Sequence, residues 1–243
     1  TLDFDATNYS IIDEPEGRID GLKRDTLWQN LKRLGRTTAY NHTMNLTYNV
    51  PINKIPGLSW TNLIARYGTR FDWQAEPMVT LRDPSIDFGN TIQNSRTIQL
   101  NPTLNFIALY NIFDFIRNQK EQQGNPVKQF FVGALTSLKN LTGSYTRTEG
   151  TFLPGYLPKT NSLGYDFNAN APGWDFIFGS QTDIRERAAR NGWITTDSLQ
   201  NQLYTTSFKE DLNLRGSLEP IRDLRIDITA LRSRSSNYST TFK

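Results

Sequence analysis

The sequence predicts an all-β membrane protein: an arc of a very large antiparallel transmembrane β-barrel with long extracellular loops and short helices. Three observations support this prediction. Apolar and polar residues alternate in several segments, these segments are longer than ordinary strands, and the connections between them are mostly short at one end and long at the other. We expect residues 1–243 to form one fragment of such a barrel. The predicted strands are 1–12, 38–50, 62–75, 97–110, 136–148, 208–218 and 224–230.

The clearest alternation lies in residues 38–50. Even positions hold Tyr40, Met44, Leu46 and Tyr48, whereas the odd positions hold Ala, Asn and Thr. A strand places successive side chains on opposite faces, so this segment has one apolar and one polar face. Strands in globular domains average about 5–6 residues, whereas a tilted strand that crosses a membrane needs about 9–11. The length of this segment therefore favours a membrane-spanning strand.

The same two-residue period assigns faces in the other segments, most weakly in 1–12 and 136–148. In an outer-membrane barrel the apolar residues face lipid and the polar residues line a hydrated lumen. The lipid-facing candidates are Tyr40, Met44, Leu46, Tyr48, Leu63, Tyr67, Phe71, Trp73, Leu212 and Leu214. The lumen-facing candidates are Arg66, Arg70, Asp72, Gln99, Asn101, Asp211, Arg215 and Arg225.

The connections predict which end lies outside the cell. Outer-membrane barrels have short periplasmic turns and longer extracellular loops. With the first strand running upward, two of the three lower connections are short and all three upper ones are long. The exception is 111–135, for which we expect a short helix or an inserted segment. The lower connections are 51–59, 111–135 and 219–223, and the upper ones are 13–37, 76–96 and 149–207.

The first upper connection contains an acidic run and a helix. Residues 13–20 hold four carboxylates, which suit either a calcium site or a solvated turn. A helix is predicted from an Asp25 cap to Gly35, with Trp28 on its apolar stripe. That stripe requires a surface, either the barrel itself or a partner protein.

The long connection 149–207 is rich in Gly, Pro and aromatic residues. Long loops in compact proteins are usually functional or disordered, and so many aromatic residues argue against disorder. We expect an extracellular cap or docking surface, with a second helix at 183–191; a carbohydrate-binding platform is the alternative. The partner or cap candidates are Trp28, Phe152, Tyr156, Trp174, Phe176 and Trp193.

Composition narrows the class of protein further. The chain has 243 residues, 37% of them apolar, and no run that approaches the ~18 consecutive apolar residues of a spanning helix. It has no cysteine, and its 27 basic and 24 acidic residues are too mixed for a nucleic-acid interface. Seven strands are too few to close a barrel around water, and no leader or initial Met is present. We therefore expect a piece of a longer chain whose open edges are filled by other segments.

The sequence predicts no catalytic residue, metal site or cofactor. His42 is the sole histidine, and it falls on the apolar side of a strand without a neighbouring Ser or carboxylate, which favours a structural role. Loop carboxylates at Asp166, Asp175, Asp183 and Glu186 are only weak candidates for glycoside hydrolysis.

Seven stretches, in order along the chain, resemble the SprA/Sov family, the giant outer-membrane β-barrel translocon of the type IX secretion system in gliding and related Gram-negative bacteria. Each stretch alone is weak, whereas the ordered set is fairly specific. The stretches are IDEPEGRID at 12–20, NVPINKIPGLSWTNL at 49–63, GNTIQNS at 89–95, GTFLPGYLPKT at 150–160, PGWDFIFGSQ at 172–181, RAARNGW at 187–193 and LNLRGSLEP at 212–220.

The resemblance implies a single-chain barrel in the cell outer membrane that conducts folded cargo proteins to the surface and supports gliding motility. It implies a PorV-like barrel partner over a lateral opening, or a periplasmic plug protein, and it brings no catalytic residues. Two other functions stay open on the sequence. One is a plugged, energy-coupled nutrient transporter barrel, and the other is a soluble secreted β-sandwich that binds glycans through its aromatic loop.

Overall fold

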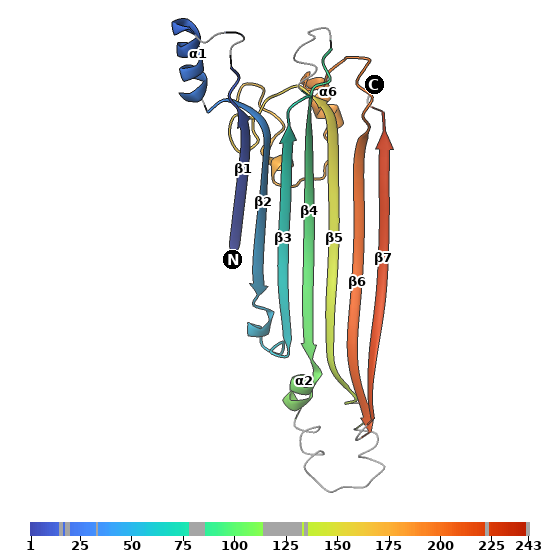
Figure 1. The fold of residues 1–243 in the computed structure, drawn as a ribbon. Coiled ribbons are helices and arrows are strands. Elements are labelled where there is room, and N and C mark those ends of the chain that lie inside the picture. Colours follow the sequence, from blue (N-terminus) through green and yellow to red (C-terminus); the bar gives the residue numbers. More distant parts are fainter. Residues whose placement is uncertain are drawn as a thin grey trace, which may run out of the picture.

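The computed structural model describes residues 1–14, 17, 20–32, 34–77, 86–113, 133, 136–221 and 224–241. These residues form a single seven-stranded sheet in which each strand pairs with the next in the sequence (Figure 1). Every pair is antiparallel. The prediction of an all-β, antiparallel arrangement of seven long strands is therefore confirmed.

The strands have 10 to 19 residues, well above the usual length. The strands are β1 Leu2–Ile11, β2 Arg36–Val50, β3 Thr61–Gln74, β4 Asn90–Asn105, β5 Leu138–Tyr156, β6 Tyr204–Ile221 and β7 Leu224–Thr240. The helices are α1 Gly21–Lys32, the 3-10 turn η1 Ile52–Lys54, α2 Phe106–Ile112, α5 Trp174–Ile177 and α6 Arg185–Arg190.

The sheet is open. Among the described residues, β1 pairs only with β2 and β7 only with β6, so each outer strand has one unpaired edge. The connections after β1, β3 and β5 emerge at one end of the sheet, here called the upper end, together with α1 and α6 (Figure 1). The connections after β2, β4 and β6 lie at the lower end.

Several predicted strand boundaries are wrong. β4 begins at Asn90 rather than at residue 97, β6 begins at Tyr204 rather than at residue 208, and β7 continues to Thr240 rather than ending at residue 230. β4 ends at Asn105 rather than continuing to residue 110, because the Asn105 side chain accepts a hydrogen bond from the Ala108 backbone N–H (3.2 Å) and caps α2. β5 continues to Tyr156, so the long connection comprises 157–203 rather than 149–207. Most of the predicted insertion at 111–135 lies outside the described residues.

Helix α1 starts earlier than predicted and leaves its stripe uncovered. The Asp20 carboxylate, rather than Asp25, accepts a hydrogen bond from a first-turn backbone N–H, that of Lys23 (3.1 Å). The side chains of Trp28 and Leu31 are exposed, and Figure 1 shows α1 beyond the upper end of the sheet. The first of the two predicted options, packing onto the barrel wall, is therefore not found.

Strand register divides the sheet into an apolar face and a polar face. On the apolar face Tyr48 lies opposite Ala65, and the same row continues through Leu100, Tyr145 and Leu212. One residue away, on the polar face, a row contains Thr47, Arg66, Gln99, Thr146 and Asp211. A one-residue slip would exchange the two faces, so this register fixes both.

The buried core lies between the upper part of the apolar face and residues 157–203, which we call the cap. This segment folds across the upper parts of the central strands (Figure 1). Strands supply Tyr40, Phe71, Trp73, Ile92 and Leu153 to the core. The cap supplies Tyr165, Ala171, Phe176, Ile177, Ile184, Ala188 and Trp193.

Candidate membrane-facing and pore-facing surfaces

The apolar face is uncovered below the cap. Tyr48 is 55% exposed and Leu46 is 42% exposed, and on β7 the side chains of Ile226 and Ile228 are similarly open. Single exposed apolar residues are ordinary, but a contiguous surface of this kind marks contact with a membrane or a protein. We call this surface the apolar band. It comprises Met44, Leu46, Tyr48, Val50, Leu63, Ala65, Tyr67, Ile98, Leu100, Pro102, Leu104, Leu141, Gly143, Tyr145, Leu212, Leu214, Gly216, Leu218, Ile226, Ile228 and Ala230.

Charged side chains on the apolar face limit this band from above. Arg96 of β4 lies 2.6 Å from Glu149 of β5, which also pairs with Arg147 at 2.7 Å. On the next strands the register places Glu210 opposite Arg147 and Arg234 opposite Glu210. On β5 to β7 the charged side chains reach lower, since Arg147 lies opposite Ile98 and Arg232 lies opposite Leu212, both in the band.

An ion pair joins β5 and β6 near the lower ends of these strands, outside the apolar band. The Lys139 ammonium lies 3.5 Å from the Glu219 carboxylate. Glu219 follows the apolar-face residue Leu218 by one position and therefore lies on the polar face of β6, so this ion pair does not border the band.

The polar face carries both signs of charge, and several of its charges are paired. The Arg70 guanidinium lies 2.8 Å from Asp72, and Arg225 lies 3.1 Å from Asp227. Asp211 pairs with Lys209 (3.1 Å) and accepts a hydrogen bond from the Ser233 hydroxyl (2.7 Å). The Gln99 amide donates to the Asn101 side chain (3.1 Å). Such groups stay hydrated and leave little net charge to attract a ligand.

All eight lumen candidates lie on the polar face. Arg66 and Gln99 face each other, and the same row reaches Asp211 through Thr146. The alternation has exceptions, since Ile64 and Leu231 also lie on this face, opposite Asn101 and Asn213 respectively. The polar-face candidates are Arg66, Arg70, Asp72, Gln99, Asn101, Asp211, Arg215 and Arg225.

All ten lipid candidates lie on the opposite face, but three of them are unable to contact lipid. The cap buries Tyr40, Phe71 and Trp73, which are 7%, 0% and 3% exposed. For these three the predicted lipid contact is replaced by contact with protein. A side chain on Gly164 of the cap would collide with the Phe71 ring, so the cap backbone approaches the sheet closely there. The other seven, Met44, Leu46, Tyr48, Leu63, Tyr67, Leu212 and Leu214, belong to the apolar band.

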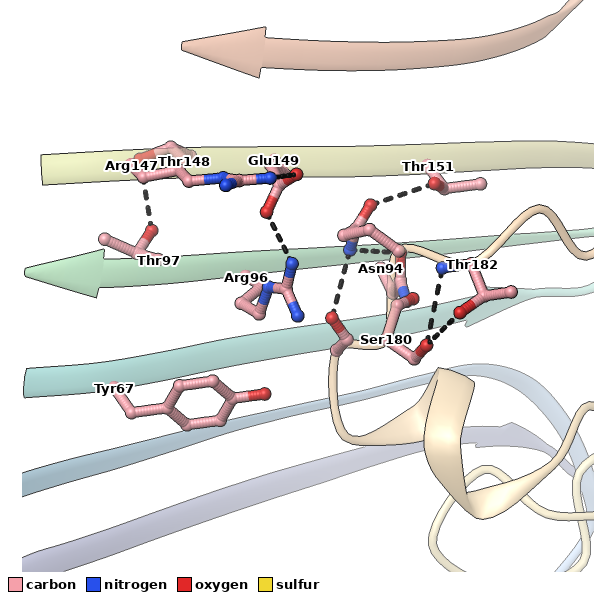
Figure 2. Close-up of polar contacts among 12 residues, drawn as sticks. Tyr67, Asn94, Arg96, Thr97, Arg147, Thr148, Glu149, Thr151, Ser180 and Thr182 are labelled. Atoms are coloured by element: carbon pink, nitrogen blue, oxygen red, sulfur yellow. Dashed lines mark hydrogen bonds and ion pairs between the residues drawn. The ribbon is translucent and has the colours of Figure 1, made fainter. Parts of the chain in front are cut away.

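A buried amide attaches the cap to the sheet. Asn94 is fully buried on the apolar face of β4, where its side-chain N–H group donates to the carbonyl oxygens of Phe176 and Ser180, both at 2.8 Å. Its own oxygen accepts from Gln181 (3.0 Å), which in turn accepts from the Thr151 hydroxyl (2.9 Å) (Figure 2). These bonds satisfy cap carbonyls that have no strand partner.

Asn94 was not among the residues predicted from the sequence, although the sequence contains a signal for its role. Asn94 occupies an even position of β4 between Ile92 and Ile98, where alternation calls for an apolar residue. An amide on an apolar face must find a partner, so its presence indicates a protein cover at that level rather than lipid.

Three of the predicted partner or cap residues belong to the buried core between the sheet and the cap. Tyr156, Phe176 and Trp193 are 1%, 1% and 5% exposed, so these rings have no surface to offer a partner. Phe152 lies half-buried on the polar face of β5, opposite Gln93. The exposed rings among the candidates are Trp28 on α1 and Trp174 on α5.

His42 is buried among aromatic rings. Its ring centroid lies 5.4 Å from that of Phe4, 5.6 Å from those of Tyr40 and Phe71, and 6.0 Å from that of Phe178. Within the described residues neither ring nitrogen has a hydrogen-bond partner.

The loop carboxylates are held in separate contacts. Asp166 accepts backbone hydrogen bonds from Lys159 (3.0 Å) and Asn168 (2.9 Å). The others form separate ion pairs: Asp175 with Arg187, Asp183 with Arg185, and Glu186 with Arg190. Each carboxylate thus has its own structural partner.

The described part of the acidic run 13–20 behaves as a loop. Arg36 holds Asp13 through two hydrogen bonds of 2.9 and 3.2 Å, and this contact lowers the pKa of the Asp13 carboxyl. Within the described residues, no three His, Cys, Asp or Glu side chains cluster as metal ligands. Part of the run, including Glu16, lies outside those residues.

Comparison with known proteins does not identify the chain. No protein-family model matches its sequence, and no curated protein matches it. Among the residues that the structure describes, no helix has both the length and the apolar character needed to span a bilayer.

Proposed function

We propose that this chain is an arc of a wide outer-membrane β-barrel that conducts folded proteins to the cell surface, as in the type IX secretion system. In this proposal the apolar band faces lipid, the polar face lines the lumen, and the cap lies on the extracellular side. The barrel is completed by strands that pair with the open edges of β1 and β7.

One observation carries the proposal: a single register separates an uncovered apolar band from a face of charged and amide groups over the six strands β2 to β7. In water alone the band would be an exposed surface of unusual size, whereas in a bilayer it would be the buried side.

The transport mechanism that this surface supports is passive. Arginine, aspartate, amide and hydroxyl groups on the polar face keep the wall hydrated, and pairs such as Arg70–Asp72 neutralise one another. A cargo protein would meet no large apolar surface and no field of one sign, so it would not adhere. Cargo proteins, outer-membrane lipids, a PorV-like barrel and a periplasmic plug are the partners that the proposal requires.

Cysteine accessibility tests the assignment of the two faces, because the chain has no cysteine of its own. Single substitutions Thr47→Cys and Arg66→Cys place a thiol on the polar face, and Leu46→Cys and Leu214→Cys place one in the band. In intact outer membranes, a charged maleimide that passes through the pore should label the first two and not the second two. All four should react after denaturation.

The labelling pattern can also contradict the proposal. Equal labelling at Thr47→Cys and Leu46→Cys in membranes would exclude the assignment of faces. Recovery of the protein in aqueous buffer without detergent would exclude the membrane location altogether. The latter result is what a soluble glycan-binding protein predicts, although a β-sandwich needs two sheets and the described residues form one.

A different measurement tests the alternative that the protein is a plugged nutrient transporter. A plug domain blocks the lumen, so the purified full-length protein in a planar bilayer would show little conductance until the plug is removed. A protein-conducting barrel without its partners should show a large, stable conductance. Small conductance that rises only on removal of an N-terminal domain would favour the transporter.

A further inference from the structure

The lower edge of the cap carries a stack of three aromatic rings, of which Tyr165 is buried, Phe178 is half-buried and Trp174 is exposed. The Tyr165 and Trp174 rings are parallel, with an interplanar angle of 2° and centroids 4.6 Å apart. The Trp174 ring then stacks on Phe178 at 6.1 Å and 17°. We call these three residues the ring stack. Trp174 is 42% exposed, although Phe176 and Ile177 of the same helix are completely buried.

The ring stack adjoins the apolar band directly. The Tyr67 hydroxyl donates to the Phe178 carbonyl oxygen (2.9 Å), so the cap edge ends at the level of Tyr67 on β3. Tyr67 lies opposite Leu46, which is uncovered. The lower edge of the cap and the upper edge of the uncovered band therefore meet at the row of paired residues that contains Leu46 and Tyr67.

The fold holds Trp174 in place. The Asp175 carboxylate accepts two hydrogen bonds from Arg187 of α6 (3.0 and 3.1 Å), and its backbone oxygen accepts one from the Ser180 N–H (2.8 Å). Asn94 fixes the next residue through the Phe176 carbonyl. An exposed indole whose following backbone is fixed in this way loses little conformational entropy when it contacts another surface.

We propose that the ring stack rests in the headgroup region of the outer leaflet, with Trp174 as an interfacial anchor that fixes the height of the cap above the membrane. This inference rests on the proposed membrane location of the band. Tryptophan concentrates at membrane interfaces because its ring is apolar while its N–H group is polar. Continuity with the band favours lipid as the occupant over a soluble partner or a second copy of the chain.

Fluorescence quenching of the full-length protein in phosphatidylcholine vesicles tests the proposal. The vesicles carry bromine either near the headgroup or deep in the acyl chain, and the Trp174 contribution is the difference between the wild type and Trp174→Phe. We expect headgroup-proximal bromine to quench that contribution about twofold more than deep bromine, as for an interfacial indole. Aqueous iodide should quench it weakly.

Trp28→Phe is the matched control, because Trp28 is also exposed but lies on α1, away from the sheet. Its contribution should respond to iodide and not to bromine. Trp174 quenched by iodide as strongly as Trp28 would overturn the anchor. Weak quenching of Trp174 by both iodide and bromine would also overturn the proposal, because it would mean that protein covers the Trp174 ring.

A Leu214→Trp reporter separates failure of the anchor from failure of the proposed function. Leu214 lies within the band, so a tryptophan there should respond to deep bromine. If the reporter responds and Trp174 does not, only the anchor is wrong. If neither responds, the membrane location of the band is wrong as well.

Discussion

The upper and lower parts of the apolar face have the same alternation and different surroundings. Phe71 in the upper part is 0% exposed beneath the cap, whereas Tyr48 in the lower part is 55% exposed. Both are aromatic residues on the same face of neighbouring strands. The difference shows that alternation identifies the face to which a side chain belongs, and that another segment decides what covers it.

The two parts also differ in their polar residues. The covered part contains Asn90 and Asn94, whose amides donate to cap carbonyls such as those of Leu157 and Phe176. The band contains no amide on this face. A protein cover brings backbone oxygens that need donors, whereas lipid acyl chains bring none. Amides on an apolar face can thus distinguish protein cover from lipid contact.

Removal of one buried ring should produce the largest effect. Phe71→Ala deletes a ring packed against cap residues such as Phe176, so we expect a loss of about 3–5 kcal/mol in unfolding free energy. Tyr48→Ala should cost roughly half as much, because lipid fills the space and no cavity remains. Urea unfolding of the protein in vesicles measures both values. Equal losses would mean that the band is also covered by protein.

Introduction of a charge should distinguish the two faces within the band. Leu46→Arg is expected to destabilise the protein by about 2–4 kcal/mol if the residue lies near the bilayer midplane. Asn45→Arg, one residue away on the polar face, should change stability by no more than about 0.5 kcal/mol. The same unfolding assay provides the comparison. If Asn45→Arg destabilised the protein more than Leu46→Arg, the polar face would be the one that contacts lipid.

The Asn94 attachment should contribute less. Asn94→Asp keeps the size of the side chain but removes both N–H donors to the cap, which we expect to cost about 1–3 kcal/mol. Protease cleavage within the cap should become faster, while the strands stay protected. Asn101→Asp on the polar face is the control and should leave the cleavage rate unchanged. Unaltered cleavage in both variants would show that the buried amide does not hold the cap.

The smallest expected effect is a pH dependence of the cap. The hydrogen bonds from the Arg185 side chain and backbone N–H lower the pKa of the Asp183 carboxyl, despite partial burial that opposes this shift. A lowered pKa in the folded state gives stability that is complete above about pH 4 and is lost as the pH falls through the folded value. Cap proteolysis measured between about pH 6 and pH 3 should show this loss.

Asp183→Asn supplies the control for that measurement. The variant has no carboxyl to titrate, so this component of the acid sensitivity should disappear. The effect should be small because the Asp183 side chain is 52% exposed and solvent screens its pair with Arg185. An unchanged pH profile would assign the acid sensitivity to other carboxylates.

Much of the sheet could be predicted from the sequence. The two-residue period located all seven strands and placed residues such as Leu46 and Arg66 on opposite faces, because side-chain direction in a strand follows directly from position. Strand ends were less predictable. Asn105 starts a helix by a local cap, and β5 extends to Tyr156 because its upper part pairs with distant strands.

The sequence by itself determined the strands, their two faces and the absence of cysteine chemistry, because these depend on residue type and on the order of neighbours. Only the tertiary structure decided that Tyr40, Phe71 and Trp73 lie under protein, that Asn94 attaches the cap, and that Trp174 stays exposed. Those outcomes join residues more than 80 positions apart, as between Asn94 and Phe176. Contacts at that separation leave no local period in the sequence, since they depend on how a long loop folds back across the sheet.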